Sequence, residues 1–373
     1  MLRAFLESIA IAASLLLCLS ARAIGERLNV MDHPNTHHKY HVHATPSVGG
    51  IAILIPLMLW LVGCLASGLL PDRELVMALL LCAAGVGVMG FTDDQTPTSP
   101  LSRVLFLLVF LAVAFAIAPQ LIAVRLNWGS FESTAIGPLA FCALMAVGTV
   151  GIVNAVNMAD GQNGLVSGMF VIWSASLMLV GDATVSLVSE LLFAVCLVAF
   201  PFNLRGKLFL GNCGSYGVTF VLGIIMMLTH AQGRISVETA LVWFFIPIMD
   251  CLRLITARLA RGHSPASADR DHFHHRLQDK LGQHYGLFAY LTTVAATSFV
   301  ATLMPRFALV AIIVLTAIYF SFASLTDSGA ARKTKSETRD EVQERASQKH
   351  QASGGRANAK VVPLSHGERS GHS

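Results

Sequence analysis

Two adjacent carboxylates, Asp93 and Asp94, directly follow an apolar segment at residues 75–91. Moving a carboxylate to the middle of a bilayer costs about 2.5–3.5 kcal/mol on insertion scales, so a carboxylate at the edge of a membrane span is a candidate functional group. The two side chains also repel each other unless a cation compensates their charge. The alternative is an ordinary polar loop that follows a membrane span.

A second group of polar residues has the spacing of one helix face. Asn154 and Asn157 are three residues apart, and Asp160 follows one turn further along. Amide and carboxylate groups in such a row can hydrogen-bond to a base or a sugar. Capping of the helix end and contacts between membrane helices would use the same residues without a ligand.

A short glycine-rich stretch at residues 211–215 contains Asn212 and precedes another apolar segment. At the start of a helix, backbone N–H groups point away from the helix and can bind a phosphate. A glycine turn of this length also occurs without a ligand, so it predicts a phosphate site only together with other motifs.

Three closely spaced histidines, His272, His274 and His275, lie in a basic segment with Arg258, Arg261, Arg270 and Arg276. Imidazole donates hydrogen bonds to phosphate oxygens and also binds metals. Zinc sites favour separated nitrogen and sulfur ligands, and no cysteine is nearby in the sequence. We therefore favour pyrophosphate binding over a metal, with a solvated basic loop as the alternative. Asp250 and Arg253, three residues apart, can pair with each other.

The elements that must position these residues are membrane helices. Hydrophobic residues make up 54% of the 373-residue chain and charged residues only 13%, which is far from the composition of soluble domains. Apolar runs long enough to cross about 30 Å of hydrocarbon recur along the chain. We predict an all-α polytopic membrane protein with about eleven transmembrane helices, at residues 4–24, 47–68, 74–91, 101–118, 136–157, 164–181, 184–202, 213–231, 238–257, 287–304 and 306–325. No strand pattern is expected.

The distribution of Lys and Arg predicts the orientation of these helices. The most basic loops follow the first, seventh and ninth predicted spans. This places those loops in the cytoplasm, the amino terminus outside and the carboxyl terminus in the cytoplasm. The polar clusters then share the cytoplasmic side, including Phe202-Asn203 between the seventh and eighth spans. The sequence thus predicts a cytoplasm-facing active site built from loops.

The composition of the chain changes after residue 325. Residues 326–373 are rich in Ser, Lys, Arg, Glu, Gln, Gly and His and contain few large apolar residues, so they cannot bury enough surface to fold. We expect a disordered cytoplasmic tail that follows a transmembrane catalytic domain at residues 1–325. The seven cysteines include no Cys-x-x-Cys pair, which argues against a disulfide framework.

Together these motifs resemble the polyprenyl-phosphate N-acetylhexosamine-1-phosphate transferases of glycosyltransferase family 4. The resemblance covers residues 1–325 and depends on five groups of motifs in the family's order. They are Asp32-x-Pro34 with Lys39-x-His41, Pro46 and Gly49-Gly50; Asp93-Asp94; Asn154-x-x-Asn157-x-x-Asp160-Gly161; Phe202-Asn203 with Gly211-x-x-Gly214-Ser215; and Pro247-x-x-Asp250 with Arg258, Gly262, Pro265, Asp269 and His272-x-His274-His275. The histidine motif is more similar to the N-acetylglucosamine-1-phosphate branch than to the peptidoglycan branch.

The resemblance implies transfer of N-acetylhexosamine 1-phosphate, with N-acetylglucosamine as the expected sugar, from a UDP-sugar to undecaprenyl phosphate. UMP would be released, and a cell-envelope polysaccharide such as an O-antigen would be started. The implied cofactor is Mg²⁺, for which Mn²⁺ can substitute, and the implied location is the bacterial inner membrane. The expected partners are the two substrates and the lipid bilayer, without nucleic acid, and a homo-oligomer is compatible with the sequence.

The resemblance also implies roles for individual residues. Asp93, Asp94 and Asp160 are the expected catalytic residues, and Asp93 and Asp94 would hold or deprotonate the lipid phosphate. Asp160 and Asn212 are the expected metal ligands. The residues expected to bind the substrates are Lys39, Asn154, Asn157, Asn203, Arg258, Asp269, His272, His274 and His275.

The chain departs from the family's pattern at several positions. Asn212 replaces an aspartate that binds Mg²⁺ in the family, and Asn163 replaces the second aspartate of an Asp-Gly-x-Asp-Gly motif. His38 stands where an arginine is usual, and Ala266 and Ala268 replace a Phe and a Pro. These changes leave open a catalytically weak or silent paralogue that acts as a binding or assembly partner. A transporter fits less well, because it would carry polar residues within its spans.

Overall fold

The structure, a computed structural model, describes residues 1–33, 44–129, 131–262 and 271–323. The chain divides into two compact units, Met1–Ala317 and Ile318–Ser373. The candidate site residues all belong to the first unit. Lys39, Asp269 and the predicted tail at 326–373 lie outside the described residues, so the expectations for them stay predictions.

Helices make up most of the described chain. They are α1 (Leu2–Leu19), α2 (Ala21–Leu28), α3 (Gly49–Ser67), α4 (Arg73–Gln95), α5 (Pro100–Ile117), α6 (Pro138–Ala159), α7 (Leu165–Val180), α8 (Ala183–Leu204), α9 (Gly211–Ala231), α10 (Val237–Trp243), α11 (Phe245–Ala260), α12 (Phe273–Leu281), α13 (Gln283–Leu303) and the helix Pro305–Ala323. Two antiparallel strand pairs were not predicted. They are β1 (Met31–Asp32) with β2 (Thr45–Pro46), and β3 (Arg125–Leu126) with β4 (Thr134–Ala135).

The prediction of an all-α polytopic membrane protein is confirmed. Within the described residues, 9 helices are long and apolar enough to cross a membrane, and the bent pair α10–α11 raises the number to 10. α7 is apolar but has only 16 residues. When α7 is included, each of the predicted spans corresponds to a helix or to a bent helix pair.

Two predicted spans are interrupted in the structure. The first ends at Leu19, and α2 continues from Ser20 as a separate helix. The span predicted at 238–257 bends by 70° between α10 and α11. Pro247 explains this break, because proline lacks an N–H group and its ring clashes with the carbonyl four residues earlier, which belongs to Trp243, the last residue of α10.

Two predicted loops are instead the last turns of helices. α4 continues through Asp93 and Asp94 to Gln95, and α8 continues through Asn203 to Leu204. Polar residues can extend a helix beyond its apolar part where neighbouring elements satisfy their side chains. The candidate site is therefore built largely from helix ends, and the expectation of a site made of loops is wrong for these residues.

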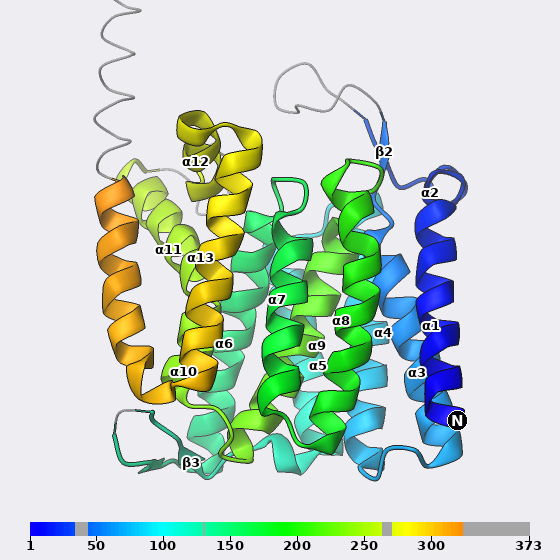
Figure 1. The fold of residues 1–373 in the computed structure, drawn as a ribbon, viewed down its shortest axis with the longest axis horizontal. Coiled ribbons are helices and arrows are strands. Elements are labelled where there is room, and N and C mark those ends of the chain that lie inside the picture. Colours follow the sequence, from blue (N-terminus) through cyan, green and yellow to red (C-terminus); the bar gives the residue numbers. More distant parts are fainter. Residues whose placement is uncertain (34–43, 130, 263–270, 324–373) are drawn as a thin grey trace, which may run out of the picture. The chain divides into compact units, whose positions relative to one another are not determined.

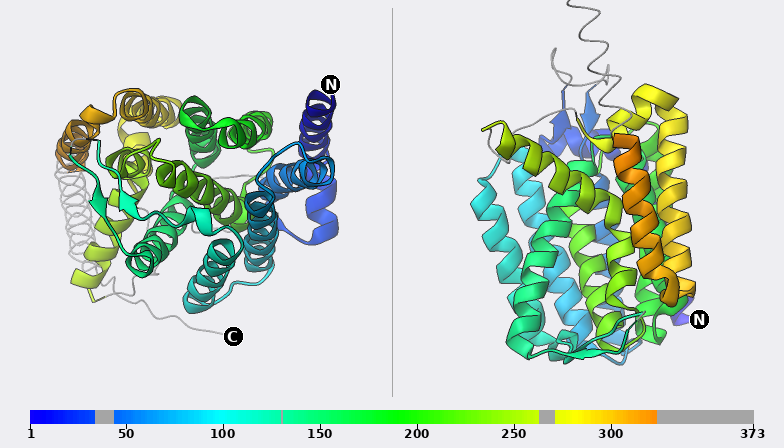
Figure 2. Two further views of the ribbon diagram at one scale, coloured as in Figure 1. Left: turned by 90° about the horizontal axis from the view of Figure 1, so that it is seen from below. Right: turned by 90° about the vertical axis from the view of Figure 1, so that its left-hand side faces the viewer.

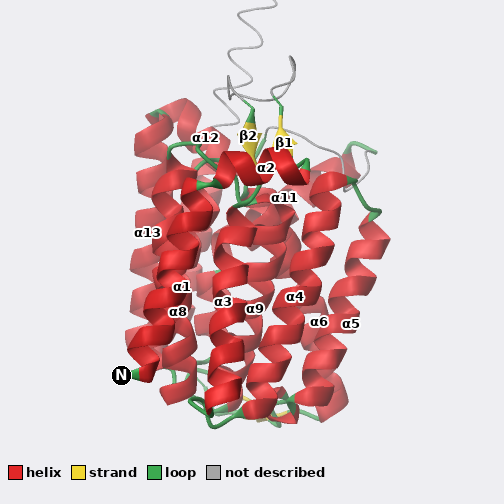
Figure 3. Ribbon diagram, turned by 90° about the vertical axis from the view of Figure 1, so that its right-hand side faces the viewer, coloured by secondary structure: helices red, strands yellow, loops and turns green. Residues whose placement is uncertain are grey.

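The polar helix ends gather at one end of the first unit. Its helices run alternately up and down, and the amino terminus lies at the end opposite α12 and β2 (Figure 1). Figure 3 shows α2 and the β1–β2 pair at the same end as α12. The carboxyl ends of α4, α6 and α8 and the amino ends of α7 and α9 consequently meet there.

α9 is the central helix of this arrangement, and 83% of its most apolar 18-residue stretch is buried. The left view of Figure 2, which looks along the helices, shows α9 with other helices around it. Its first turn lies against the backbones of α3 and α4. A Cβ added at Gly50 of α3 would lie only 2.2 Å from Gly214 N, and a Cβ added at Gly90 of α4 would lie only 2.4 Å from Asn212 O. Small residues allow membrane helices to approach this closely. The two glycines thus fix the first turn of α9 beside the last turn of α4.

Candidate active site

Asp93 lies at the centre of a hydrogen-bonded cluster, and its side chain is 1% exposed. Its Oδ1 accepts from the Thr98 N–H at 2.6 Å and from the Thr98 hydroxyl at 2.7 Å. Its Oδ2 accepts from Asn212 Nδ2 at 2.9 Å and from the Tyr216 hydroxyl at 3.3 Å, and it lies 3.3 Å from Arg103 Nε. The carboxylate is therefore held in one orientation by groups from α5, α9 and the turn between α4 and α5.

Asp94 binds the amino end of α9. Its Oδ1 accepts from the Asn212 N–H at 2.8 Å, and its Oδ2 accepts from the Cys213 N–H at 3.1 Å. The first N–H groups of a helix have no partner within the helix, and negative charge is favoured beside them. Gly211 has φ +68°, and a Cβ there would lie 2.6 Å from Asp94 Oδ2. These N–H groups, which the sequence suggested for a phosphate, thus bind a carboxylate of the chain itself.

Asn157 joins the same cluster from α6. Its Oδ1 accepts from the Ser215 hydroxyl at 2.7 Å, and its Nδ2 donates to the Tyr216 hydroxyl at 3.4 Å. The predicted residues Asp93, Asn157 and Asn212 are consequently connected through α9. Only one described hydrogen bond involves the Asn212 side chain, the one from Nδ2 to Asp93, and its Oδ1 stays without a partner among the described residues.

Asp160 follows the end of α6 and is partly buried. Burial raises the pKa of Asp160 well above its usual range, and the charge of Asp94 adds to this effect. No described residue donates a hydrogen bond to its carboxylate. A cation beside Asp160 would favour the charged form.

The histidines form a compact cluster at the start of α12. His272 Nδ1 lies 3.0 Å from Asp250 Oδ2, and the Phe273 N–H donates to Asp250 Oδ1 at 3.0 Å. The rings of His272 and His274 stack with their centroids 5.3 Å apart, and those of His274 and His275 are 4.2 Å apart. Asp250 thus fixes α12 against α11 and orients the imidazole of His272.

His274 links this cluster to the end of α6. It is 2% exposed, and its Nε2 has no hydrogen-bond partner among the described residues. Burial lowers the pKa of His274 well below its usual range, and charge on His275 and His272 lowers it further. This imidazole is therefore neutral at pH 7. A Cβ added at Gly161 would lie 3.0 Å from His274 Nε2, so the histidines lie directly against the turn that follows Asp160.

The arginines near the histidines take part in ion pairs. Arg253 Nη2 lies 3.0 Å from Asp250 Oδ1, which confirms the predicted pair, and Arg253 Nη1 lies 2.9 Å from Asp271 Oδ2. Arg276 lies 2.6 Å from the other Asp271 oxygen. Arg258, a predicted binding residue, is on α11 and is 4% exposed.

Two other predicted binding residues bond within the protein. Asn154 Nδ2 donates to a carbonyl one turn earlier in α6 at 2.7 Å. Asn203 is 2% exposed. Its Oδ1 accepts from the Gly164 N–H at 2.8 Å and from the Ser167 hydroxyl at 2.7 Å, while its Nδ2 donates to the Leu208 carbonyl at 3.1 Å. Asn203 thus fixes the start of α7, and its role as a substrate ligand stays a prediction.

Sequence reasoning missed three residues of the Asp93 cluster, Thr98, Arg103 and Tyr216. Arg103 is the single basic residue of the apolar segment 101–118, and a charge within a membrane span is a signal that could have identified it. Tyr216 directly follows the glycine-rich stretch but carries no distinguishing pattern. Its bond to Asp93 joins residues from two helices that are far apart in the sequence.

Mg²⁺ fits the residues around Asp160. This ion prefers oxygen ligands, keeps several waters and is bound through one or two carboxylates together with substrate phosphates. The Asp160 carboxylate and the Asn212 Oδ1 are unpartnered among the described residues, and a cation would relieve the repulsion between Asp160 and Asp94. Asp250, His272 and His274 also offer ligand atoms within 4.8 Å of one another, but imidazole ligands suit transition metals better than Mg²⁺.

Fold and site together define a multi-pass membrane protein in which polar helix ends of the described residues meet at one end of the first unit. The family model for glycosyl transferase family 4 matches residues 76–230, a range that contains Asp93, Asp94, Asn157, Asp160 and Asn212.

Curated relatives extend this match over most of the chain. The undecaprenyl-phosphate alpha-N-acetylglucosaminyl 1-phosphate transferase of Escherichia coli (strain K12) is 30% identical over 292 residues, which cover 74% of this chain and 76% of the relative. The transferase of the same name from Salmonella typhimurium is 31% identical over 291 residues, with the same two coverages. That of Yersinia pestis is 28% identical over 292 residues, covering 74% of this chain and 77% of the relative. The chain belongs to glycosyl transferase family 4, a family of sugar-phosphate transferases, and the resemblance inferred from its motifs is confirmed.

Proposed function

We propose that the chain transfers N-acetylhexosamine 1-phosphate, with N-acetylglucosamine as the sugar, from a UDP-sugar to undecaprenyl phosphate. An oxygen of the lipid phosphate attacks the sugar-bound phosphorus of the UDP-sugar. The bond from that phosphorus to the bridging oxygen breaks, and UMP leaves with that oxygen. The names of the relatives support the acceptor and the sugar.

The observation that carries this proposal is the buried Asp93 beside Arg103 at the end of α4. Their Oδ2 and Nε atoms are 3.3 Å apart. A guanidinium binds phosphate oxygens through charge-assisted hydrogen bonds, and a carboxylate can accept a proton from a phosphate monoester. Phosphoryl transfer depends mainly on positioning and on charge neutralisation. Arg103 would thus hold the lipid phosphate, while Asp93 orients it and accepts its proton.

The surrounding residues serve the other substrate. The histidine cluster beside Gly161 would bind the diphosphate of the UDP-sugar, and Asn157 would bind the nucleotide. Asp160 and Asn212 would hold Mg²⁺, which supplies positive charge for the diphosphate when it is bound. Asp94 would act as a positioning residue, because its bonds to the start of α9 bring Asn212 and Tyr216 to Asp93.

We infer that this enzyme lies in the bacterial inner membrane and that its product starts a cell-envelope polysaccharide. The multi-pass fold and the bacterial relatives support the location. The bias of Lys and Arg supports an outer amino terminus and a cytoplasmic carboxyl terminus, which would expose the site to a cytoplasmic nucleotide sugar.

A second candidate is a catalytically silent paralogue that binds the same molecules as an assembly partner. Asn212 favours it, because its Nδ2 donates to Asp93 Oδ2 at 2.9 Å, a bond that an ionised carboxylate at this position could not make. A neutral residue at this position is thus one of the hydrogen-bond donors to Asp93.

Release of UMP by the purified full chain in lipid vesicles tests the proposal. Release that requires both UDP-N-acetylglucosamine and undecaprenyl phosphate would support it, and UDP-N-acetylgalactosamine in parallel reports the choice of sugar. Release without the lipid phosphate would contradict the acceptor. Binding of the nucleotide sugar without release at any Mg²⁺ concentration would favour the silent paralogue.

A further inference from the structure

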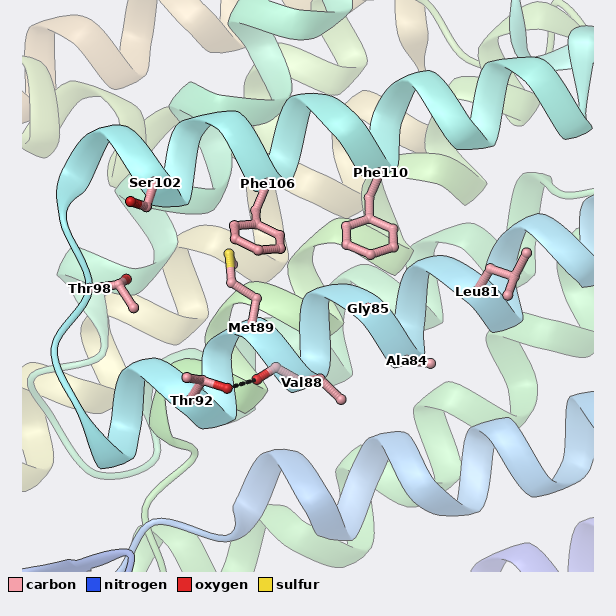
Figure 4. A pocket seen from close by; sticks show the side chains of 10 residues that line it. All are labelled: Leu81, Ala84, Gly85, Val88, Met89, Thr92, Thr98, Ser102, Phe106 and Phe110. Atoms are coloured by element: carbon pink, nitrogen blue, oxygen red, sulfur yellow. Dashed lines mark hydrogen bonds between the residues drawn. The ribbon is translucent and has the colours of Figure 1, made fainter.

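Among the described residues, Asp250, His272 and His274 offer metal-ligand atoms that all lie within 4.8 Å of one another. The side chains of Asp250 and His272 are 8% and 12% exposed, and His274 is 2% exposed. The groove between α4 and α5, by contrast, is lined by apolar side chains and three hydroxyl groups (Figure 4) and offers neither a carboxylate nor an imidazole. The largely buried group on α11 and at the start of α12 thus has the residue types of a second metal site.

His274 Nε2 is a buried ligand atom without a partner among the described residues. A buried polar atom that lacks a hydrogen bond in a folded protein indicates an ion, a water or a ligand at that place, and neutral imidazole is the commonest metal ligand. A Cβ added at Gly161 would lie 3.0 Å from this nitrogen. Gly161 therefore leaves free the space beside His274 Nε2 that a larger side chain would fill.

Asp250 Oδ2 and His272 Nδ1 have nearly the separation of two ligands of one metal ion. They lie 3.0 Å apart, whereas two ligand atoms at about 2.1 Å from a tetrahedral Zn²⁺ lie about 3.4 Å apart. An ion can replace this hydrogen bond after a movement of about 0.4 Å. The other oxygen, Asp250 Oδ1, accepts from the Phe273 N–H at 3.0 Å and lies 3.0 Å from Arg253 Nη2. Bonds of this kind orient ligating carboxylates in metal sites.

The charges around this group suit an anionic ligand once a dication is bound. Arg253 and Arg276 pair with Asp271 at 2.9 and 2.6 Å, and Arg253 also pairs with Asp250. The two positive and two negative charges of these four side chains cancel. A divalent cation would leave an excess of positive charge, which phosphate oxygens neutralise.

We propose that Asp250, His272 and His274 bind one divalent transition-metal ion. Imidazole and carboxylate together suit ions such as Zn²⁺, whereas Mg²⁺ prefers oxygen ligands. In the sequence, the closely spaced histidines alone argued against zinc. The structure adds a separated ligand, because Asp250 of α11 lies 22 residues before His272 in the chain. The ion would hold the start of α12 against α11, and it would be distinct from the Mg²⁺ assigned to Asp160.

Three protein ligands leave one position of a tetrahedral ion open. A phosphate oxygen of the UDP-sugar would occupy this position, and only this use of the site rests on the proposed function. The metal site itself goes beyond that function, since it requires only the three side chains.

Zn²⁺ binding to the purified full chain, measured by competition with a chromophoric chelator, tests the site without turnover. His274→Ala removes one ligand, and the matched control His284→Ala removes an exposed imidazole at the start of α13. Loss of a residue that only orients a metal ligand already costs about 10–100-fold in affinity. We therefore expect the Kd of the tightest Zn²⁺ site to rise by about a hundredfold or more in His274→Ala and to stay unchanged in His284→Ala. An excess of Mg²⁺ should not displace the ion.

Two further measurements separate metal binding from the folding of the variants. Zn²⁺ should raise the Tm of the wild type and of His284→Ala but not that of His274→Ala, because a ligand stabilises the state that binds it. Asp250→Asn, which keeps the size of the side chain, should also weaken Zn²⁺ binding. Equal Zn²⁺ affinity in all three variants would place the ion at other residues of the chain and overturn the proposal.

The outcomes separate this inference from the proposed function. UDP-N-acetylglucosamine should lower the Kd for Zn²⁺, and an unchanged Kd would overturn the use of the open position for the diphosphate. A chain that binds Zn²⁺ and loses it in His274→Ala but releases no UMP would retain the metal site and contradict the proposed function. An active wild type that binds no Zn²⁺ would overturn the metal site alone.

Discussion

Asp93 is surrounded by donors on both of its oxygens, and they come from a turn, from α5 and from α9. Such networks are held in one arrangement only while every member keeps its partner. A substitution that removes the Asp93 side chain would therefore disturb its neighbours as well as the proposed chemistry. A test of the chemical role must remove the charge of this side chain while keeping its size and shape.

Asp93→Asn makes that change. We expect the rate of UMP release to fall by at least about a hundredfold, the lower end of what a positioned acid or base contributes, because the amide carries no charge and cannot accept the proton. The control is Asp72→Asn at the other end of α4, where Asp72 accepts from the Leu75 N–H at 2.9 Å and Asn is an equally good cap. Near-normal turnover in Asp93→Asn would show that this carboxylate has a structural role and does not accept the proton.

Asn212→Asp tests the metal ligands. The substitution removes the donor to Asp93 and adds a negative charge. The attraction between this charge and a cation at ~4 Å is worth roughly 1 kcal/mol per unit charge in a water-like dielectric and roughly 4 kcal/mol near a protein surface. We expect the Mg²⁺ concentration for half-maximal rate to fall by about tenfold or more. Asn212→Ala, which removes the oxygen as well, should raise it. If the Mg²⁺ concentration for half-maximal rate were the same in both variants as in the wild type, Asn212 would not be a ligand of the metal.

Residue types and spacing predicted several residues that the structure brings together, but they did not predict the partners of these residues. Asp93, Asn157, Asp160 and the three histidines stand in recognisable motifs. The bonds of Asp94 to α9 and of Asn203 to α7 depend on which helix ends become neighbours, which local sequence does not encode. Lys39 and Asp269 lie outside the described residues, so their predicted roles are untested.

At the scale of elements, the site depends on how closely α3 and α4 approach the first turn of α9. Gly50→Ala places a Cβ 2.2 Å from Gly214 N, and overpacking of this kind typically costs about 1–3 kcal/mol of stability. We expect a lower Tm in detergent together with reduced UMP release, because the cluster at the start of α9 would shift.

The matched control is Gly148→Ala in α6, where an added Cβ meets no atom within 4 Å. Alanine also suits a helix interior better than glycine, so the Tm should stay the same or rise. If Gly50→Ala left the Tm equal to that of the control, the close approach would contribute nothing to stability.

Hydropathy predicted the existence of the helices well and their ends less well. Apolar runs identify the part of a helix that lies in hydrocarbon, whereas α4 and α8 continue into polar residues whose side chains bond to neighbouring helices. The bend between α10 and α11 had a local signal in Pro247, and the two strand pairs are too short to produce an alternating pattern.

At the scale of the whole molecule, the polar helix ends of the first unit share one side, which makes orientation a decisive test. Cysteine labels at Ser99, which caps α5, and at Ser264 should report the cytoplasm, because positive loops stay inside. A label at Thr134 in β4, beyond the other end of α5, should report the outside. Labelling of Ser99 and Thr134 from the same side would contradict the predicted topology.

The short length of α7 has a consequence for the surrounding bilayer. Its 16 residues rise about 24 Å, which is several Å less than the roughly 30 Å of a typical hydrocarbon core. A span shorter than the local thickness is accommodated by thinning of the bilayer, by snorkelling of flanking residues or by oligomerisation. We expect the lipid beside α7 to be thinned toward Gly181 and Asp182, and we expect the protein to be more stable in membranes of shorter acyl chains.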